Sequence, residues 1–273
     1  MITSNTRAII LGCGSSGGVP RLGSEPHGGW GLCDRHNPKN RRRRCSLIVE
    51  VTSTEGTTRV LIDTSPDLRE QLLDHHIESL DAILITHEHA DHTHGIDDLR
   101  PLVMGMRKRL DCFMDDVTSR VMQQRFGYCF QTPPKSDYPP ILNEKRMIAR
   151  QSFQISGAGG AIDFTPFELQ HGAIKALGFR FLNMAYVPDV NHILPESAPF
   201  FENLDTLILD SLRYKAHPTH FNLEQALEVI AAFKPTRTIL TNLHNDMDYE
   251  TLKALLPEHV TPAYDGMTIS LNV

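Results

Sequence analysis

The sequence has few cysteines, and their positions exclude the common cysteine-based frameworks. Its 273 residues include five cysteines, which are odd in number, scattered along the chain, and form no C-x-x-C pair. A disulfide framework or a structural zinc knuckle would require a paired and regular spacing. We therefore expect the cysteines to be reduced.

Long apolar runs and an excess of positive charge are also missing. Residues 8–11 form an apolar run of four residues, which is too short for the core of a signal peptide, and no later segment approaches transmembrane length. The formal net charge of −6 argues against general binding to nucleic acids or membrane surfaces. We expect a cytoplasmic protein with no membrane partner and no stable nucleic-acid complex.

No repeat of fixed period and no low-complexity linker divides the chain, so the simplest expectation is one domain over residues 1–273. Short β-type runs recur, each bounded by turn residues, and helical patterns lie between some of them. The expected strands are 8–11, 45–51, 58–63, 82–86, 161–169, 177–182, 206–210 and 238–242. The expected helices are 67–75, 95–107, 115–126, 223–233 and 249–256, with Asn222 as a plausible N-cap.

Two familiar motifs are matched only superficially. The segment GCGSSG at residues 12–17 fits G-x-G-x-x-G, but a Gly- and Pro-broken loop follows where a dinucleotide site needs a helix. A tight glycine-rich turn beside an active site is the better interpretation. The segment HEHAD begins like H-E-x-x-H, but Asp91 stands where the second histidine should be, so the helical zinc-ligand pair is absent.

The richest segment for chemistry is LITHEHADHTHG, residues 84–95. In the spacing H-x-H-x-D-H, His87 and His89 alternate along the chain and can point the same way, and Asp91 and His92 follow at the turn into a helix. Three histidines and a carboxylate packed this tightly are costly without cations. Two ligand sets within six residues suggest two metal ions.

Six residues cannot complete two coordination shells, so further ligands must come from other strand ends. His171 follows the run 161–169, Asp189 follows the run MAYVP at residues 184–188, and His244 follows the run 238–242, and each lies where a strand should give way to a loop. An aspartate between two cations can bridge them, and such a pair, about 3.5–4 Å apart, is used in hydrolysis.

These motifs resemble the metallo-β-lactamase superfamily over nearly the whole chain. The likeness is closer still to the phosphoribosyl cyclic phosphodiesterases, because of LGCGSSGGVP, NPKNRRRRCS, LIDTSPDLR, ILITHEHADHTHGIDDLRPL, PTHFNLEQAL and YDGMTI. The resemblance implies an αββα sandwich, in which two mixed sheets are flanked by helices. It also implies a homodimer.

The resemblance assigns roles to individual residues. The first metal would be bound by His87, His89 and His171, the second by Asp91, His92 and His244, and Asp189 would bridge them. His220 matches a histidine that faces the reacting phosphate, which makes His220 and Asp91 the catalytic candidates. Asp63 matches a carboxylate that supports the metal-binding loop and could orient an imidazole. Glu88 and His94 have no matching metal role.

The chain departs from these phosphodiesterases at an additional zinc site. Ser24 and Pro26 stand at two of its three cysteine positions, only Cys33 remains nearby, and Met247 replaces its histidine. The sequence therefore predicts that this structural zinc site is absent. The departure weakens the transfer of an exact substrate, because the affected loop should lie near the entrance.

The function that follows is hydrolysis of a small phosphodiester, such as a cyclic ribosyl phosphate or nucleotide, by a hydroxide held between two metals. His220 would protonate the leaving oxygen or bind the phosphate. The run KNRRRR at residues 39–44 is the one strong basic patch; Arg43 and Arg44 are candidates for phosphate binding, while a solvated turn is the competing interpretation.

Several alternatives stay open. The same metal ligands could serve a thioesterase, a lactonase or a tRNA-processing nuclease, and a non-catalytic protein that binds a nucleotide or sugar phosphate belongs to a different class. Zinc, manganese and iron all suit mixed imidazole and carboxylate ligands. The loop at residues 131–144, with four prolines, could be a stiff surface excursion or part of a substrate-covering wall.

Overall fold

The computed structural model describes residues 5–24 and 28–271. Two compact units are present: unit 1 comprises the described parts of Met1–Ile9, Ser46–Phe164 and Thr268–Val273, and unit 2 comprises those of Ile10–Cys45 and Thr165–Met267. Two strands, β1 and β8, run from one unit into the other. The expectation of a single domain stays a prediction.

Unit 1 is built on a mixed sheet whose strand order is β14-β1-β2-β3-β4-β5-β6. The strands are β1 Asn5–Gly12, β2 Ser46–Ser53, β3 Gly56–Ile62, β4 Ala82–Leu84, β5 Leu110–Met114, β6 Leu142–Arg146 and β14 Thr268–Leu271. From β3 to β6 the strands are parallel, whereas β2 with β3 and β1 with β14 are antiparallel. The three residues of β4 are all buried, as is typical of a central parallel strand.

The helices of unit 1 are α1 Leu68–Asp74, α2 Ala90–Thr93, α3 Arg100–Met106 and α4 Asp116–Phe130, and a 3-10 helix, η2 Ile96–Leu99, precedes α3. The α4 helix begins with Asp115 as N-cap, whose side chain accepts from the N–H of Thr118 at 2.8 Å. Residue 126 departs from helical dihedral angles, so α4 is kinked near its end.

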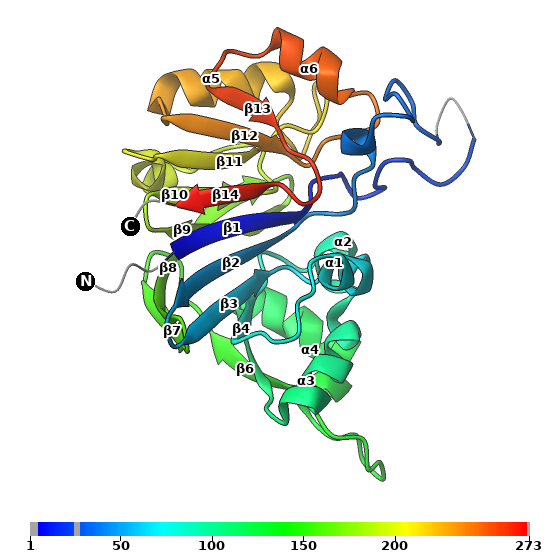
Figure 1. The fold of residues 1–273 in the computed structure, drawn as a ribbon, viewed down its shortest axis with the longest axis vertical. Helices are drawn as coiled ribbons and strands as arrows, with labels where there is room; N and C mark the ends of the chain where they lie inside the picture. Colours follow the sequence, from blue (N-terminus) through cyan, green and yellow to red (C-terminus); the bar gives the residue numbers. More distant parts are fainter. Residues whose placement is uncertain (1–4, 25–27, 272–273) are drawn as a thin grey trace. The chain divides into compact units, whose positions relative to one another are not determined.

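The proline-rich loop after α4 is shorter than the sequence indicated, because β6 already begins at Leu142. This loop extends away from the rest of unit 1 (Figure 1). Arg100 anchors it: its Nη1 donates to the carbonyl oxygen of Pro139 at 2.9 Å, and its guanidinium lies 4.0 Å from the centroid of the Tyr138 ring.

The remaining sheet has the strand order β13-β12-β11-β10-β9-β8-β7. Strands β9 to β13 and the end of β8 lie in unit 2, whereas β7 and the part of β8 that pairs with it lie in unit 1. The strands are β7 Phe153–Gly157, β8 Gly160–His171, β9 Ile174–Phe181, β10 Met184–Val187, β11 Thr206–Asp210, β12 Arg237–Thr241 and β13 Val260–Pro262. From β10 to β13 the strands are parallel, and β8, β9 and β10 are antiparallel.

Two helices, α5 Leu223–Phe233 and α6 Tyr249–Leu255, accompany β12 and β13 in unit 2 (Figure 1), together with the 3-10 helices η1 Pro38–Asn40 and η3 Pro195–Phe201. The α5 helix has the expected N-cap: Asn222 accepts from the N–H of Gln225 at 2.9 Å, and Gln225 accepts in return from the N–H of Asn222. Its buried face joins a core that also contains Phe167, Phe201 and Leu240.

The elements expected from sequence are present, with shifted ends. Six strands lie outside the ranges listed from the sequence, namely β5, β6, β7, β10, β13 and β14, of which β10 corresponds to the run before Asp189. After the glycine-rich segment of residues 12–17 the chain forms a turn, with Gly18 at φ 64°, and no helix follows directly.

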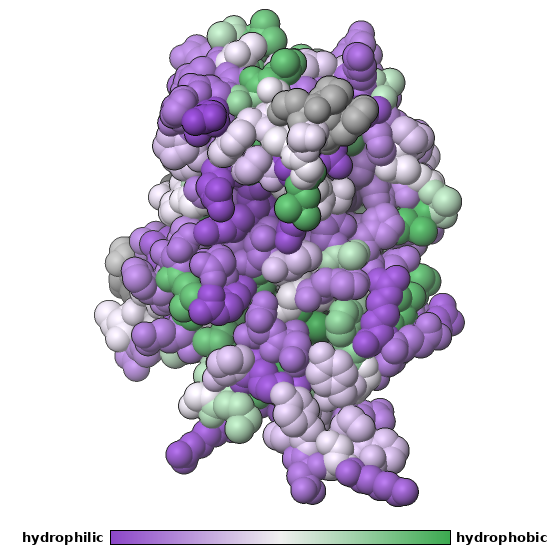
Figure 2. All heavy atoms as spheres, turned by 90° about the vertical axis from the view of Figure 1, so that its right-hand side faces the viewer, coloured by the Kyte–Doolittle hydropathy of each residue, from purple (hydrophilic) through white to green (hydrophobic). Residues whose placement is uncertain are grey.

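No described helix is long and apolar enough to cross a membrane. On the face drawn in Figure 2, hydrophilic side chains predominate and apolar ones form small, separate patches.

Candidate metal centre

The first group of predicted ligands lies in unit 1, in the loop between β4 and α2. The rings of His87 and His89 lie 4.6 Å apart between centroids, and those of His87 and His92 lie 4.4 Å apart. His87 and His92 are buried, whereas His89 is exposed. Asp91 is partly exposed, with Oδ2 3.7 Å from Nε2 of His92. The short motif thus gathers three imidazoles and a carboxylate.

Asp63 supports this loop from the residue after β3. Its Oδ1 accepts from the N–H of Thr86 at 2.8 Å, and its Oδ2 lies 2.7 Å from Nδ1 of His92. Thr86 Oγ1 donates to the same carboxylate and lies 2.9 Å from Nδ1 of His87. Burial raises the pKa of Asp63, and the contacts with His92 and Thr86 act in the lowering direction. One buried carboxylate therefore orients two histidines of the motif.

The two remaining polar side chains of the motif make other contacts. The carbonyl oxygen of Glu88 accepts from Nη1 of Arg125 at 2.6 Å, which ties the loop to α4. The exposed ring of His94 packs edge-on against Phe126, at 5.2 Å between centroids, and its Nδ1 lies 3.2 Å from Oγ1 of Thr93. Metal binding is not needed to account for either position.

The second group lies in unit 2, at the ends of β8 and β10 and in the segment before α5. Potential ligand atoms of His171, Asp189 and His220 lie within 4.8 Å of one another. The rings of His171 and His220 are 4.6 Å apart between centroids. Nδ1 of His171 donates to the carbonyl oxygen of Thr219 at 2.7 Å.

Asp210, the last residue of β11, is a site residue that the sequence did not single out. Its Oδ2 lies 2.8 Å from Nδ1 of His220 and accepts from the N–H of Val190 at 3.0 Å. Asn242, directly after β12, donates to Asp189 at 2.9 Å and lies 3.2 Å from Asp210 Oδ1. Burial raises the pKa of Asp210 to about 6, although His220 acts to lower it. In the sequence, the signal for Asp210 is that a carboxylate stands at the end of the expected strand 206–210.

His217 was also missed, although it stands three residues before His220 in the segment HPTH. Its ring is 5.2 Å from that of His220 between centroids. Burial lowers the pKa of His217, and the neighbouring charges of His220, Arg213, His171 and His244 act in the same direction.

His244, the third predicted ligand of unit 2, is held from both sides of its ring. Nδ1 lies 3.1 Å from Oδ1 of Asp246, and Nε2 lies 2.6 Å from Nη1 of Arg21. Arg21 reaches it across Gly17, where an added Cβ would lie 2.5 Å from the arginine Nε. A side chain at position 17 would therefore displace the guanidinium of Arg21 from this path.

The basic run at residues 39–44 does not act as one patch. Arg42 is buried, and its guanidinium donates to the carbonyl oxygens of Met247, at 2.7 Å, and His244, at 3.3 Å. It also contacts Cys33 Sγ at 3.8 Å. Met247 and Cys33 are two of the positions discussed above for an additional zinc site. A third position, Pro26, lies outside the described residues. The backbone N–H of Arg43 donates to Asp265 at 2.7 Å. Phosphate binding by Arg43 and Arg44 stays a prediction.

The donor set fits divalent metal ions. In three predicted ligands, His92, His171 and His244, Nδ1 contacts an oxygen acceptor. An imidazole whose Nδ1–H is donated in this way carries its lone pair on Nε2, as in most protein metal sites. The arrangement leaves Nε2 as the coordinating nitrogen on His92 and His171, whereas Nε2 of His244 contacts Arg21 in this structure.

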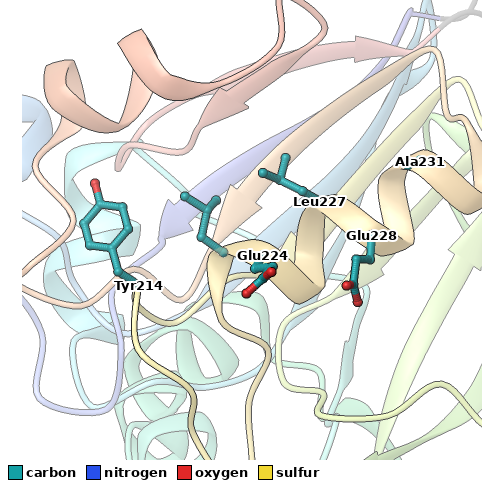
Figure 3. Close-up of a pocket in the computed structure, with 6 residues that line it drawn as sticks. Tyr214, Glu224, Leu227, Glu228 and Ala231 are labelled. Atoms are coloured by element: carbon teal, nitrogen blue, oxygen red, sulfur yellow. The ribbon is translucent and has the colours of Figure 1, made fainter.

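One groove of unit 2 is separate from these residues. It has a volume of about 550 Å³ and is lined by Tyr214 and by side chains of α5, among them Glu224, Leu227 and Glu228 (Figure 3). None of the predicted ligands lines it.

Comparison with known proteins identifies the family. The family model described as the beta-lactamase superfamily domain matches residues 58–242. The chain belongs to the beta-lactamase superfamily. A solved structure of a diphosphatase from the PhnP family is similar to this superfamily member over 98% of both chains, with 32% identity and a TM-score of 0.86. Zn²⁺-bound PqqB from Methylobacterium extorquens shares the fold, with 16% identity, a TM-score of 0.77, and coverage of 97% of this chain and 100% of PqqB. The metallo-β-lactamase fold, with two mixed sheets flanked by helices, is thereby confirmed.

Two curated proteins also match this superfamily member. An octanoyltransferase of Porphyromonas gingivalis is 33% identical over 96% of this chain and 51% of its own length. The exodeoxyribonuclease WalJ of Streptococcus pneumoniae is 26% identical over 49% of this chain and 45% of its own length. The chain therefore spans about half the length of the curated relatives that it matches.

Proposed function

We propose that the chain is a metal-dependent phosphodiesterase that hydrolyses a small phosphodiester, such as a cyclic ribosyl phosphate or nucleotide. The observation that carries the proposal is the contact between Asp210 and His220, 2.8 Å from Oδ2 to Nδ1, beside His171 and Asp189. The likeness to a PhnP-family diphosphatase supports phosphorus as the reacting centre, and the superfamily supports metal-dependent hydrolysis.

We further propose that the chain binds two divalent ions. The proposed ligands are His87, His89, Asp91, His92, His171, Asp189 and His244. When bound, such ions supply Lewis-acid chemistry: they acidify a water molecule and neutralise charge on a phosphoryl oxygen. The protein's part is to fix the rings through Asp63, the Thr219 carbonyl and Asp246.

In this proposal His220 donates a proton to the leaving oxygen. Its Nδ1–H points to the carboxylate of Asp210, so the imidazolium form is stabilised and the proton to be given away is on Nε2. Burial raises the pKa of Asp210 to about 6 and His220 acts to lower it, so the carboxylate is ionised above that pH. Asn242, which contacts both Asp210 and Asp189, holds the two carboxylates in place.

Acyl hydrolysis is the second candidate, because the octanoyltransferase of P. gingivalis matches the chain at 33% identity. The matched part is about half of that protein, and the Asp210–His220 pair serves a thiolate leaving group less than an alkoxide, which needs a proton more. The pneumococcal exodeoxyribonuclease is a match that fits phosphodiester chemistry.

One set of assays tests the proposal. Protein purified without added metal is analysed for its metal content, stripped with a chelator, and reloaded with zinc, manganese or iron. Each form is assayed with bis(p-nitrophenyl) phosphate, a 2′,3′-cyclic nucleotide, a single-stranded DNA oligonucleotide, an octanoyl thioester and a lactone. We expect the loaded protein to hydrolyse the first two and the stripped protein to be inactive. Hydrolysis of the thioester or lactone alone would favour acyl chemistry, and inactivity on all five would favour a binding protein.

A further inference from the structure

The segment between β11 and α5 presents two imidazoles side by side, and only His220 has a role so far. His217 is half-buried, with its ring 5.2 Å from that of His220 and tilted by 47°. His217 therefore lies beside His220 in the unit 2 group.

The hydrogen bonds of His217 fix which of its nitrogens carries the proton. Its Nδ1 accepts from the backbone N–H of Thr219 at 3.3 Å and lies 3.2 Å from Oγ1 of the same residue. Since a backbone N–H can only donate, Nδ1 must be unprotonated, and the neutral ring carries its proton on Nε2. Within the described ranges, no hydrogen bond to Nε2 of His217 is formed.

Thr219 is itself held firmly, so this orientation is built into the fold. Its carbonyl oxygen accepts from Nδ1 of His171 at 2.7 Å, and its side chain packs over Gly172, where an added Cβ would lie 2.4 Å from Cγ2. Gly172 has φ 60°, which favours glycine. One residue thus orients the predicted ligand His171 through its carbonyl and His217 through its N–H.

The two neighbouring imidazoles are prepared for different tasks. His220 donates through Nδ1 to a carboxylate, an arrangement that stabilises the protonated ring and suits proton transfer. His217 accepts at Nδ1 from an amide, an arrangement that keeps the ring neutral and leaves Nε2–H as a fixed hydrogen-bond donor. A phosphoryl oxygen, which is negatively charged and needs a donor but no proton, matches such a group.

We propose that His217 is a second catalytic residue, whose Nε2–H donates a hydrogen bond to a nonbridging oxygen of the substrate's phosphoryl group; this inference rests on the proposed phosphodiesterase function. The hydrogen bond strengthens as negative charge develops on that oxygen in the transition state. Because the bond is not to the leaving group, its effect is independent of the leaving group's basicity. His220, in contrast, acts on the leaving oxygen.

Two substitutions separate this role from a structural one. In His217→Gln, the amide nitrogen of the side chain can donate from near the position of Nε2. In His217→Asn, the amide oxygen can still accept from the N–H of Thr219, but no donor reaches the position of Nε2. We expect His217→Asn to lower kcat/KM by about 10²-fold, equally for bis(p-nitrophenyl) phosphate and a 2′,3′-cyclic nucleotide, and His217→Gln to retain activity within about tenfold.

The matched controls are His259→Asn and His259→Gln, on an exposed histidine of unit 2, which should leave both activities unchanged. Metal content and thermal unfolding of every variant are measured, and we expect them to match those of the wild type. ¹⁵N NMR of the imidazoles should identify the Nε2–H form of His217. An Nδ1–H form, a variant order in which His217→Asn is the more active, or a loss confined to the cyclic nucleotide would each overturn the proposal.

Affinity for inorganic phosphate provides a readout other than activity. We expect His217→Asn to bind phosphate about tenfold more weakly than His217→Gln, as one charge-assisted hydrogen bond would require. If the metal-loaded wild type hydrolyses neither phosphodiester, the proposed function fails, yet the phosphate affinities still decide whether His217 binds a phosphoryl group. Equal affinities of the two variants would overturn that role.

Discussion

The Nδ1 atom of His92 lies 2.7 Å from Oδ2 of Asp63, and both side chains are buried in unit 1. Asp63 has φ 66°, an unusual value for a residue other than glycine, and comes directly after β3. Because parallel β3 and β4 end at the same edge of their sheet, the carboxylate reaches the loop that follows β4. A β strand thus delivers the acceptor that orients a histidine 29 residues further along the chain.

Replacement of Asp63 by Asn should weaken metal binding. The amide cannot supply a charged acceptor for Nδ1–H of His92, so the ring becomes less basic and less firmly oriented, and affinity should fall about 10- to 100-fold. Competition with a chromogenic chelator measures the change. Asp137→Asn, at an exposed position in the loop after α4, is the matched control. Unchanged metal affinity in Asp63→Asn would show that this contact does not tune the ligand.

His220→Gln should discriminate between leaving groups. If His220 protonates the leaving oxygen, kcat for a 2′,3′-cyclic nucleotide, which releases a strongly basic alkoxide, should fall by about 10²–10⁴-fold. With bis(p-nitrophenyl) phosphate, which releases a weakly basic phenolate, the loss should be much smaller. Asp210→Asn should show the same selectivity, because it removes the carboxylate that stabilises the imidazolium. Equal losses on both substrates would instead assign His220 to phosphate binding.

The sequence predicted the ligand-rich loop of unit 1 well, because its chemistry is local: four candidate ligands lie within six residues. The Asp189, Asp210 and Asn242 cluster is different. These residues follow or end β10, β11 and β12, and they meet because the three strands are parallel neighbours. Periodicity identifies individual strands, but it does not determine which strands are adjacent, so Asp210 and Asn242 were not assigned to the site.

The unexpected strands have a similar physical explanation. β6 contains Glu144, Lys145 and Arg146, which are exposed at the edge of the sheet, and charged side chains are common there because they discourage pairing with other chains. Its sequence therefore does not resemble that of a buried strand. β10 and β13 have only four and three residues, too few for an alternating pattern to be distinctive.

Arg42→Met should destabilise unit 2, whereas Arg41→Met should not. Arg42 is buried and donates to two backbone carbonyls in the segment of residues 244–247, so its loss leaves buried acceptors unpaired. We expect the free energy of unfolding to fall by about 2–5 kcal/mol. Arg41, the preceding residue in the same basic run, is exposed, so its replacement should change stability by about 0.5 kcal/mol or less. Urea unfolding compares the two, and equal stabilities would contradict the structural role of Arg42.

Asp265 should make the stability of the protein decrease between about pH 4 and pH 7. Its carboxylate accepts from the N–H groups of Cys13, at 3.1 Å, and Arg43, at 2.7 Å, yet burial raises its pKa from 3.8 to about 7. Between these values the folded chain keeps a proton that the unfolded chain has lost, so the free energy of unfolding falls as pH rises. The total decrease is on the order of 4 kcal/mol once pH exceeds the folded pKa.

Asp265→Asn has no such proton, so its free energy of unfolding should fall less between about pH 4 and pH 7. The amide should also lower stability at every pH, because its N–H group faces a backbone N–H. Urea unfolding at a series of pH values measures how the free energy of unfolding of each protein changes with pH, with Asp137→Asn as control. Equal pH dependence in Asp265→Asn and the wild type would show that Asp265 does not titrate as described.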